Sequence, residues 1–151
     1  MKNISELLNI HRIKDLQSNS KDEALAEMIK LVSDSPEVTS PQALLRAIKY
    51  RENIISTGVG LGIAIPHAKI SSVTDFVVAL GRSKEGIQYQ SLDNKPVHLI
   101  FLIAASDTQG NEFLKILAKI SSIFKNPANI KKVRDAKSPE NILSLLKNIE
   151  R

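Results

Sequence analysis

The sequence contains no cysteine and no apolar run long enough to cross a lipid bilayer. The absence of cysteine excludes a disulfide framework, a thiolate metal site and a cysteine nucleophile. The first residues, Met1 to Glu6, lack the apolar segment of a signal peptide. We therefore expect a cytoplasmic protein without stable membrane insertion.

Tryptophan is also absent, and aromatic residues make up only 4% of the chain, which leaves little support for a base-stacking platform. The net charge is +5, from 21 basic and 16 acidic residues. The lysines are spread along the chain apart from Lys131 and Lys132, which with Arg134 are expected to form a solvated helix face. We expect no nucleic acid partner, because this moderate charge fits an acidic or phosphorylated protein at least as well.

Several catalytic motifs are missing. There is no Gly-x-Ser-x-Gly elbow of a serine hydrolase and no Gly-Lys-Ser/Thr of a P-loop. The three histidines, His11, His67 and His98, do not have the spacing of zinc ligands. The sequence therefore predicts neither a bound metal nor a cofactor.

The length of 151 residues, 42% of them hydrophobic, suits one domain with a full core and is too short for two ordinary domains. We expect a single α/β domain over residues 1–151, in which helices cover both faces of a mixed β-sheet. The longest apolar run, residues 97–105, is predicted to be a central strand buried on both faces. Further strands are expected at residues 11–16, 63–65, 73–80 and 87–89, and helices at residues 1–10, 20–35, 40–51, 111–126, 130–135 and 138–149.

Serine residues mark three of the expected helix starts. Ser20 and Glu23 have the spacing of a capping box. Ser40-Pro41 and Ser138-Pro139 place a hydroxyl before a proline that can occupy the first helical position. These signals predict the starts of the second, third and last helices.

Residues 57–69 hold the features that most favour a reactive site. Gly58, Gly60 and Gly62 alternate with other residues, and such glycines can adopt positive φ values and direct backbone N–H groups toward an anion such as phosphate. A short buried strand is expected to follow. Because Pro66 has no N–H, it should interrupt strand pairing and present the next side chain, His67, at a strand edge.

Three segments together carry a resemblance to a known family: Arg51-Glu52, Ser56-Thr57-Gly58 and Gly62-Ile63-Ala64-Ile65-Pro66-His67. They resemble the signature of the fructose/mannitol-type enzyme IIA domains of the bacterial sugar phosphotransferase system, including their nitrogen-regulatory relatives. The order of elements along nearly the whole chain also fits that family.

The resemblance implies that His67 is the phosphorylated nucleophile. Histidine suits this role because it is substantially neutral near pH 7 yet readily protonated, so it can attack phosphorus and later leave. Arg51 has two interpretations, a cation at a helix C-terminus or a fork that holds phosphoryl oxygens, and the resemblance favours the second. Thr57 offers a hydroxyl donor nearby.

The resemblance also implies partners. A phosphocarrier of this family takes its phosphoryl group from the phosphohistidine of HPr, or of the nitrogen-branch HPr, and passes it to an enzyme IIB component during sugar uptake. The alternative is a regulatory module, whose binding to a transporter or kinase depends on the phosphorylation of His67.

One position departs from the family pattern. Many of these domains have a second histidine at the start of the helix after the central strand, and the alignment places Phe113 there. The edge of the site at Phe113 is therefore expected to be apolar. His98, near the start of the central strand, is interpreted as a structural histidine, and His11 as a solvent-facing strand residue.

Overall fold

The computed structural model describes residues 3–54 and 58–150, and within them six strands form one sheet. Their bounds are Ile13–Asp15 (β1), Gly58–Gly60 (β2), Ile63–Ala64 (β3), His67–Lys69 (β4), Val77–Ile87 (β5) and Val97–Ala105 (β6). The strand order is β1-β5-β6-β3-β2, and β4 pairs with β6 farther along the same strand. Because β5 and β6 are antiparallel whereas β3 and β4 run parallel to β6, the sheet is mixed, as predicted.

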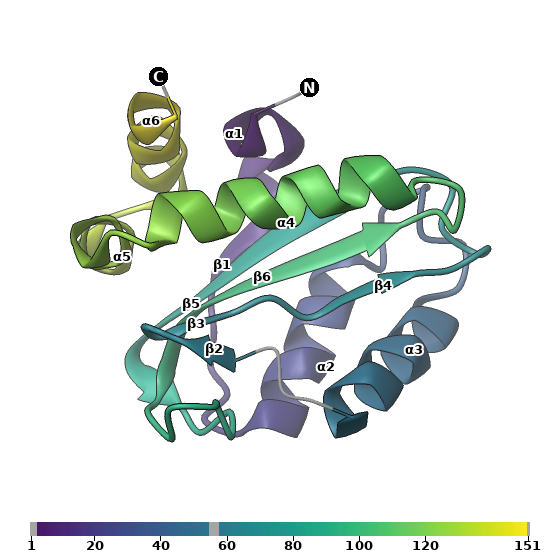
Figure 1. Cartoon of the computed structure of the whole chain (residues 1–151), viewed down its shortest axis with the longest axis horizontal. Coiled ribbons are helices and arrows are strands. Elements are labelled where there is room, and N and C mark those ends of the chain that lie inside the picture. Colours follow the sequence, from purple (N-terminus) through teal and green to yellow (C-terminus); the bar gives the residue numbers. More distant parts are fainter. Residues whose placement is uncertain (1–2, 55–57, 151) are drawn as a thin grey trace.

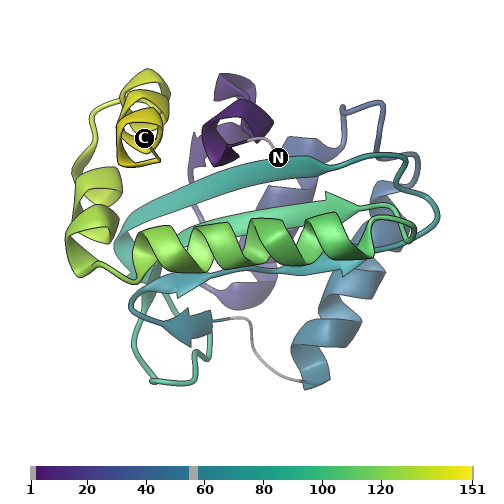
Figure 2. The same ribbon diagram turned by 45° about the horizontal axis from the view of Figure 1, so that its top comes forward.

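Helices cover both faces of this sheet, which confirms the predicted fold class (Figure 1). Lys21–Val32 (α2) and Pro41–Ile54 (α3) lie on one face. The other face carries Ile4–Leu7 (α1), Gly110–Phe124 (α4), Pro127–Asp135 (α5) and Pro139–Ile149 (α6). Figure 2 shows that α4 runs along the strands. None of the helices in the described ranges is long and apolar enough to span a bilayer.

Strand β6 lies at the centre of the core, as its apolar sequence predicted. Phe101 and Ile103 pack into the cluster beneath α4, whereas Ile100 and Leu102 pack into the cluster beneath α2 and α3, and all four are fully buried. Burial of each such side chain stabilises the fold by about 1.5–3 kcal/mol. The strand is therefore a rigid support for β3 and β4, which pair with it.

Two of the three predicted serine caps are formed. The Ser40 hydroxyl accepts a hydrogen bond from the Ala43 N–H at 3.2 Å, and the Ser138 hydroxyl accepts one from the Asn141 N–H at 3.1 Å. Helix α2 begins after Ser20 as expected, but the Ser20 side chain makes no capping hydrogen bond. The helix starts were thus predicted correctly from local sequence.

Strand β5 differs from its prediction, because it continues to Ile87 instead of ending before Gly81. The glycine serves close packing in the middle of the strand. A Cβ at Gly81 would lie 2.6 Å from Met28 Sδ and 2.7 Å from Leu16 Cδ1. Gly81 therefore lets α2 approach the sheet. The separate strand expected at residues 87–89 is not formed, because Ile87 ends β5 and Gln88 makes only an isolated bridge with Ser20.

The N-terminal segment and the fifth helix also differ in detail. His11 lies in a 3-10 turn, Ile10–Arg12 (η1), and the strand expected from residue 11 begins only at Ile13. The His11 side chain is exposed, as expected. Helix α5 begins at Pro127, three residues before the predicted start, because the Asn126 side chain caps it by accepting a hydrogen bond from the Ala128 N–H.

Candidate functional site

His67 is the first residue of β4, directly after the proline that separates this strand from β3. Both short strands pair in parallel with β6, so the chain resumes the same pairing after Pro66. His67 is in register with Ile103, and its side chain is half-buried. The strand interruption predicted at Pro66 is therefore confirmed, and it places His67 near the C-terminal end of the central strand.

The backbone fixes the tautomer of the His67 ring. Nδ1 lies 2.6 Å from the Ile65 carbonyl oxygen. Since a carbonyl oxygen only accepts hydrogen bonds, Nδ1 carries the proton in the neutral ring and donates it to Ile65. The lone pair that is available for reaction is then on Nε2.

The electrostatic surroundings favour this neutral form of the imidazole. Burial lowers the pKa of His67 below its usual value, and it is the largest cause of the shift. The hydrogen bond to Ile65 raises the pKa, and so does the negative charge of Glu52. Arg51 and Lys69 lower it through their positive charges. The net lowering means that His67 stays uncharged to lower pH than an exposed histidine does.

Phe113, in the first turn of α4, forms the wall beside this ring. The two ring centroids lie 5.1 Å apart with an interplanar angle of 54°. Phe113 is only 3% exposed, so its ring keeps water from one side of the imidazole. The expected apolar edge at Phe113 is therefore present in the structure.

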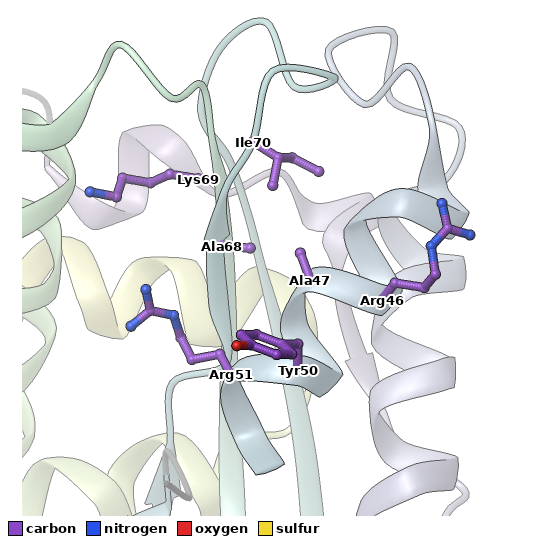
Figure 3. A pocket seen from close by; sticks show the side chains of 7 residues that line it. All are labelled: Arg46, Ala47, Tyr50, Arg51, Ala68, Lys69 and Ile70. Atoms are coloured by element: carbon purple, nitrogen blue, oxygen red, sulfur yellow. The ribbon is translucent and has the colours of Figure 1, made fainter. Parts of the chain in front are cut away.

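Two cations stand near His67 on neighbouring elements. Arg51 is in the last turn of α3, and Lys69 is the last residue of β4. In Figure 3 the Arg51 guanidinium and the Lys69 ammonium extend to the same side of β4, while Arg46 points the other way. All three residues line a hollow of about 470 Å³ between α3 and β4, together with the exposed Tyr50. Arg51 and Lys69 therefore act on His67 as two positive charges, and Glu52 acts on it as a negative one.

Sequence reasoning did not select Lys69. The available signal was its spacing, because residues two apart on a strand share a face, and His67 and Lys69 are so placed.

Glu52 was named in the sequence only as part of the family motif. Its buried carboxylate accepts a hydrogen bond from the Tyr89 hydroxyl at 2.9 Å and pairs with Lys21 Nζ at 2.8 Å. Glu52 thus anchors the end of α3 that carries Arg51.

The glycines lie farther from His67 than the sequence suggested. Gly60 and Gly62 have φ values of 102° and 83° and form the turn between β2 and β3. The Gly62 carbonyl accepts hydrogen bonds from the N–H groups of His98 and Leu99. His67 pairs with Ile103, four residues beyond Leu99, which corresponds to about 13 Å along the strand.

Gly58 pairs with Ala64, three residues before His67, or about 10 Å along the strand. The register thus places Gly58, Gly60 and Gly62 about 10–13 Å along the strands from His67, and their role in binding phosphate stays a prediction. Gly60 and Gly62 form the tight antiparallel turn between β2 and β3, whereas Gly58 begins β2, where an added Cβ would lie 2.5 Å from Ser91 Oγ. Thr57, the expected hydroxyl donor, lies outside the described residues.

His98 has a structural role, as interpreted from the sequence. Its Nδ1 lies 2.8 Å from the Ser83 carbonyl oxygen, and a Cβ at Gly62 would lie 3.5 Å from its ring. Within the described part of the chain, no group of three His, Asp or Glu side chains is arranged to hold a metal ion.

Comparison with known proteins gives a consistent result. Residues 6–149 match the family model described as "Phosphoenolpyruvate-dependent sugar phosphotransferase system, EIIA 2". The chain is 39% identical over 144 residues to the PTS system fructose-specific EIIABC component of Bacillus subtilis (strain 168). That match covers 95% of this chain and 23% of the relative, so the chain spans about a quarter of the length of that protein.

Solved structures share the fold over almost their whole length. The nitrogen regulatory protein IIA-Ntr from Neisseria meningitidis superposes with a TM-score of 0.88 at 28% identity, covering 95% of this chain and 98% of that one. Enzyme IIAMTL from Escherichia coli, in a complex with phosphorylated enzyme IIBMTL, superposes with a TM-score of 0.80 at 21% identity, covering 93% and 97%. Because the family model matches nearly all of the sequence, the chain belongs to the EIIA 2 family of the phosphoenolpyruvate-dependent sugar phosphotransferase system, whose members are phosphotransfer proteins.

Proposed function

We propose that this protein is a phosphocarrier in which His67 Nε2 accepts a phosphoryl group from the phosphohistidine of HPr, or of its nitrogen-branch counterpart, and passes it to an enzyme IIB component. The observation that carries this proposal is the state of the His67 ring. Its Nδ1 proton is committed to the Ile65 carbonyl, which leaves the Nε2 lone pair free. The lowered pKa keeps that lone pair unprotonated.

The transfer needs little beyond positioning and charge stabilisation. His67 Nε2 attacks phosphorus, an N–P bond forms, and the N–P bond of the donor breaks. The donor imidazole leaves with the electron pair of that bond and takes up a proton. Arg51 supplies a guanidinium that stabilises the phosphoryl oxygens, and its planar fork suits two oxygens at once.

The second half of the function is the transfer of the phosphoryl group from His67 to an acceptor protein. Phosphorylated His67 becomes the donor, and its own imidazole is the leaving group when an acceptor attacks phosphorus. Enzyme IIBMTL, which is phosphorylated in the Escherichia coli complex with enzyme IIAMTL, is the kind of partner that we propose as the acceptor from this chain. Phe113 shields one side of the ring, which favours transfer to a docked protein over hydrolysis.

The test is incubation with phosphoenolpyruvate, enzyme I and HPr, followed by peptide mapping. We expect one acid-labile, base-stable phosphate on His67, and NMR of the labelled ring should place it on Nε2. His67→Ala should take up no label, while His98→Gln and His11→Gln should label normally. A phosphate on His98 or His11, with His67→Ala still labelled, would overturn the proposal.

A regulatory role is the second candidate, and the similarity to nitrogen regulatory protein IIA-Ntr favours it. In this role the phosphorylation of His67 sets the affinity for a transporter or kinase, without onward transfer. The two functions separate in one experiment, in which the purified phosphoprotein is mixed with enzyme IIB. Loss of phosphate from His67 with its gain on enzyme IIB supports the carrier, whereas retention of phosphate supports the regulator.

A further inference from the structure

Lys69 emerges from β4 on the same side as His67. The two residues are two positions apart on the strand, and the residue between them, Ala68, is buried in the cluster that packs against α2 and α3. Alternation along the strand directs His67 and Lys69 toward α4 on the opposite face. The Lys69 side chain is therefore positioned by the strand itself.

The Lys69 ammonium lies beside the same ring that contacts His67. Its Nζ is 5.4 Å from the centroid of the Phe113 ring, and the His67 ring is 5.1 Å from that centroid. The ammonium also lies at the start of α4, because a Cβ added at Gly110 would be 3.8 Å from Nζ. Phe113 thus contacts both groups, which places the His67 ring and the Lys69 ammonium in one region of the site.

Of the charges that act on the His67 ring, Arg51 and Lys69 are positive and Glu52, which is paired with Lys21, is negative. Among the described residues no carboxylate pairs with Lys69, and the three ion pairs found there join other side chains. The start of a 15-residue helix repels an ammonium, because its N-terminal end carries partial positive charge. The contact with the Phe113 ring offsets this by only about 0.5–1 kcal/mol at an exposed position. The arrangement is therefore one that a bound anion would stabilise.

We propose that the Lys69 ammonium binds the phosphoryl group carried by His67, on the side of the imidazole opposite to the end of α3, so that Lys69 and Arg51 neutralise it together. This inference rests on the proposed phosphorylation of His67. The positive charge of Lys69 already acts on the unmodified ring, since it contributes to the lowered pKa of His67.

The chemical role differs from that of Arg51. During transfer the negative charge spreads over the three phosphoryl oxygens while the N–P bond to the donor breaks and the N–P bond to Nε2 forms. Arg51 can bind two of these oxygens with its fork, whereas Lys69 is a point charge with three rotatable donors. Lys69 should therefore stabilise the phosphorylated form of His67, and not only the transition state of phosphoryl transfer.

The test is the equilibrium constant for phosphoryl exchange between phospho-HPr and this protein, measured by intact mass spectrometry from both directions. Lys69→Met keeps most of the side-chain length and removes the charge. We expect the equilibrium to shift toward phospho-HPr by about tenfold, the size of one lost hydrogen bond to a charged group. Lys69→Arg, which keeps the positive charge, should return the equilibrium constant most of the way to the wild-type value.

Arg46→Met is the matched control, because Arg46 is a cation that lines the same hollow but points away from the His67 side. It should leave the equilibrium constant unchanged. A role of Lys69 in docking HPr alone would slow the forward and reverse reactions equally, so it would leave the equilibrium constant at the wild-type value. That result would overturn the inference.

Failure of this inference differs from failure of the proposed function. If the wild-type protein takes no phosphate on His67, the proposed function fails. If the wild-type protein and Lys69→Met are both labelled on His67 with the same equilibrium constant, only the role of Lys69 fails. An equal shift in Arg46→Met would also overturn it, because it would show that general surface charge, and not the position of Lys69, sets the equilibrium.

Discussion

Removal of the Phe113 ring tests how the apolar wall controls the chemistry of His67. Phe113 and Phe124 lie on the same helix, α4, and are 3% and 2% exposed. Phe113 contacts His67, whereas Phe124 contacts Phe101 at 5.4 Å between ring centroids. Because both rings are buried to the same extent, Phe113→Ala and Phe124→Ala should each lower the free energy of unfolding by about 3–5 kcal/mol.

Of the two variants, only Phe113→Ala should change the pKa of His67. Burial is the main cause of the lowered pKa of His67, so admission of water should raise this pKa toward the usual value of a histidine. The charged neighbours that act on the ring, Arg51, Glu52 and Lys69, remain in both variants. As the pH is lowered, phosphoryl transfer should therefore decline at a higher pH in Phe113→Ala than in the wild-type protein, because His67 becomes protonated at a higher pH in the variant.

The measurement is an NMR titration of the His67 ring protons in the wild-type protein and the two variants, with urea denaturation to confirm matched destabilisation. The hydrolysis rate of the isolated phosphoprotein is a second measurement, and it should rise in Phe113→Ala only. The reasoning is refuted if the pKa of His67 is the same in Phe113→Ala as in the wild-type protein, or if Phe124→Ala raises it equally.

Two further variants separate function from packing. Arg51→Lys keeps the positive charge but loses the planar fork, so the rate of phosphoryl transfer should fall. The free energy of unfolding, measured by urea denaturation, should change by less than about 0.5 kcal/mol. Equal losses of transfer rate and stability would indicate a structural role for Arg51. Gly81→Ala should destabilise the fold by about 1–3 kcal/mol without affecting the labelling of His67, because its Cβ would meet Met28 Sδ at 2.6 Å; unchanged stability would show that α2 can move away freely.

The features that the sequence predicted well depend on neighbouring residues. Proline at 66 removes a donor from the strand, and this local property was enough to predict the interruption before His67. The starts at Pro41 and Pro139 follow from serine caps that bond within three residues. The central strand was predicted because residues 97–105 are nearly all apolar, which suits a strand covered on both faces.

The features that the sequence did not predict depend on residues far apart in the chain. Gly81 was interpreted as the end of a strand, and the packing of Met28 and Leu16 against it explains a glycine in mid-strand. The glycines at 60 and 62 have the spacing of an anion-binding loop, and the pairing of β2 with β3 places them in a turn about 13 Å along the strand from His67. Lys69 became visible as a site residue only when α4 was placed beside β4.

A protein that carries a phosphoryl group on histidine must yield it to a protein and withhold it from water. If His67 is the phosphorylated residue that we propose, different residues of the site meet these two requirements. The bond from Nδ1 to the Ile65 carbonyl and the lowered pKa make Nε2 a ready acceptor. Phe113 offers no proton and excludes water from one side of the ring. Because Nδ1 keeps its proton on the Ile65 carbonyl, the His67 ring leaves as neutral imidazole when an acceptor attacks phosphorus, so release depends on the partner that docks on the open face. Slow release in the absence of a partner is a property that both the carrier and the regulator need, so Phe113 is compatible with either role, and the choice between them depends on whether an enzyme IIB can approach the open side of His67.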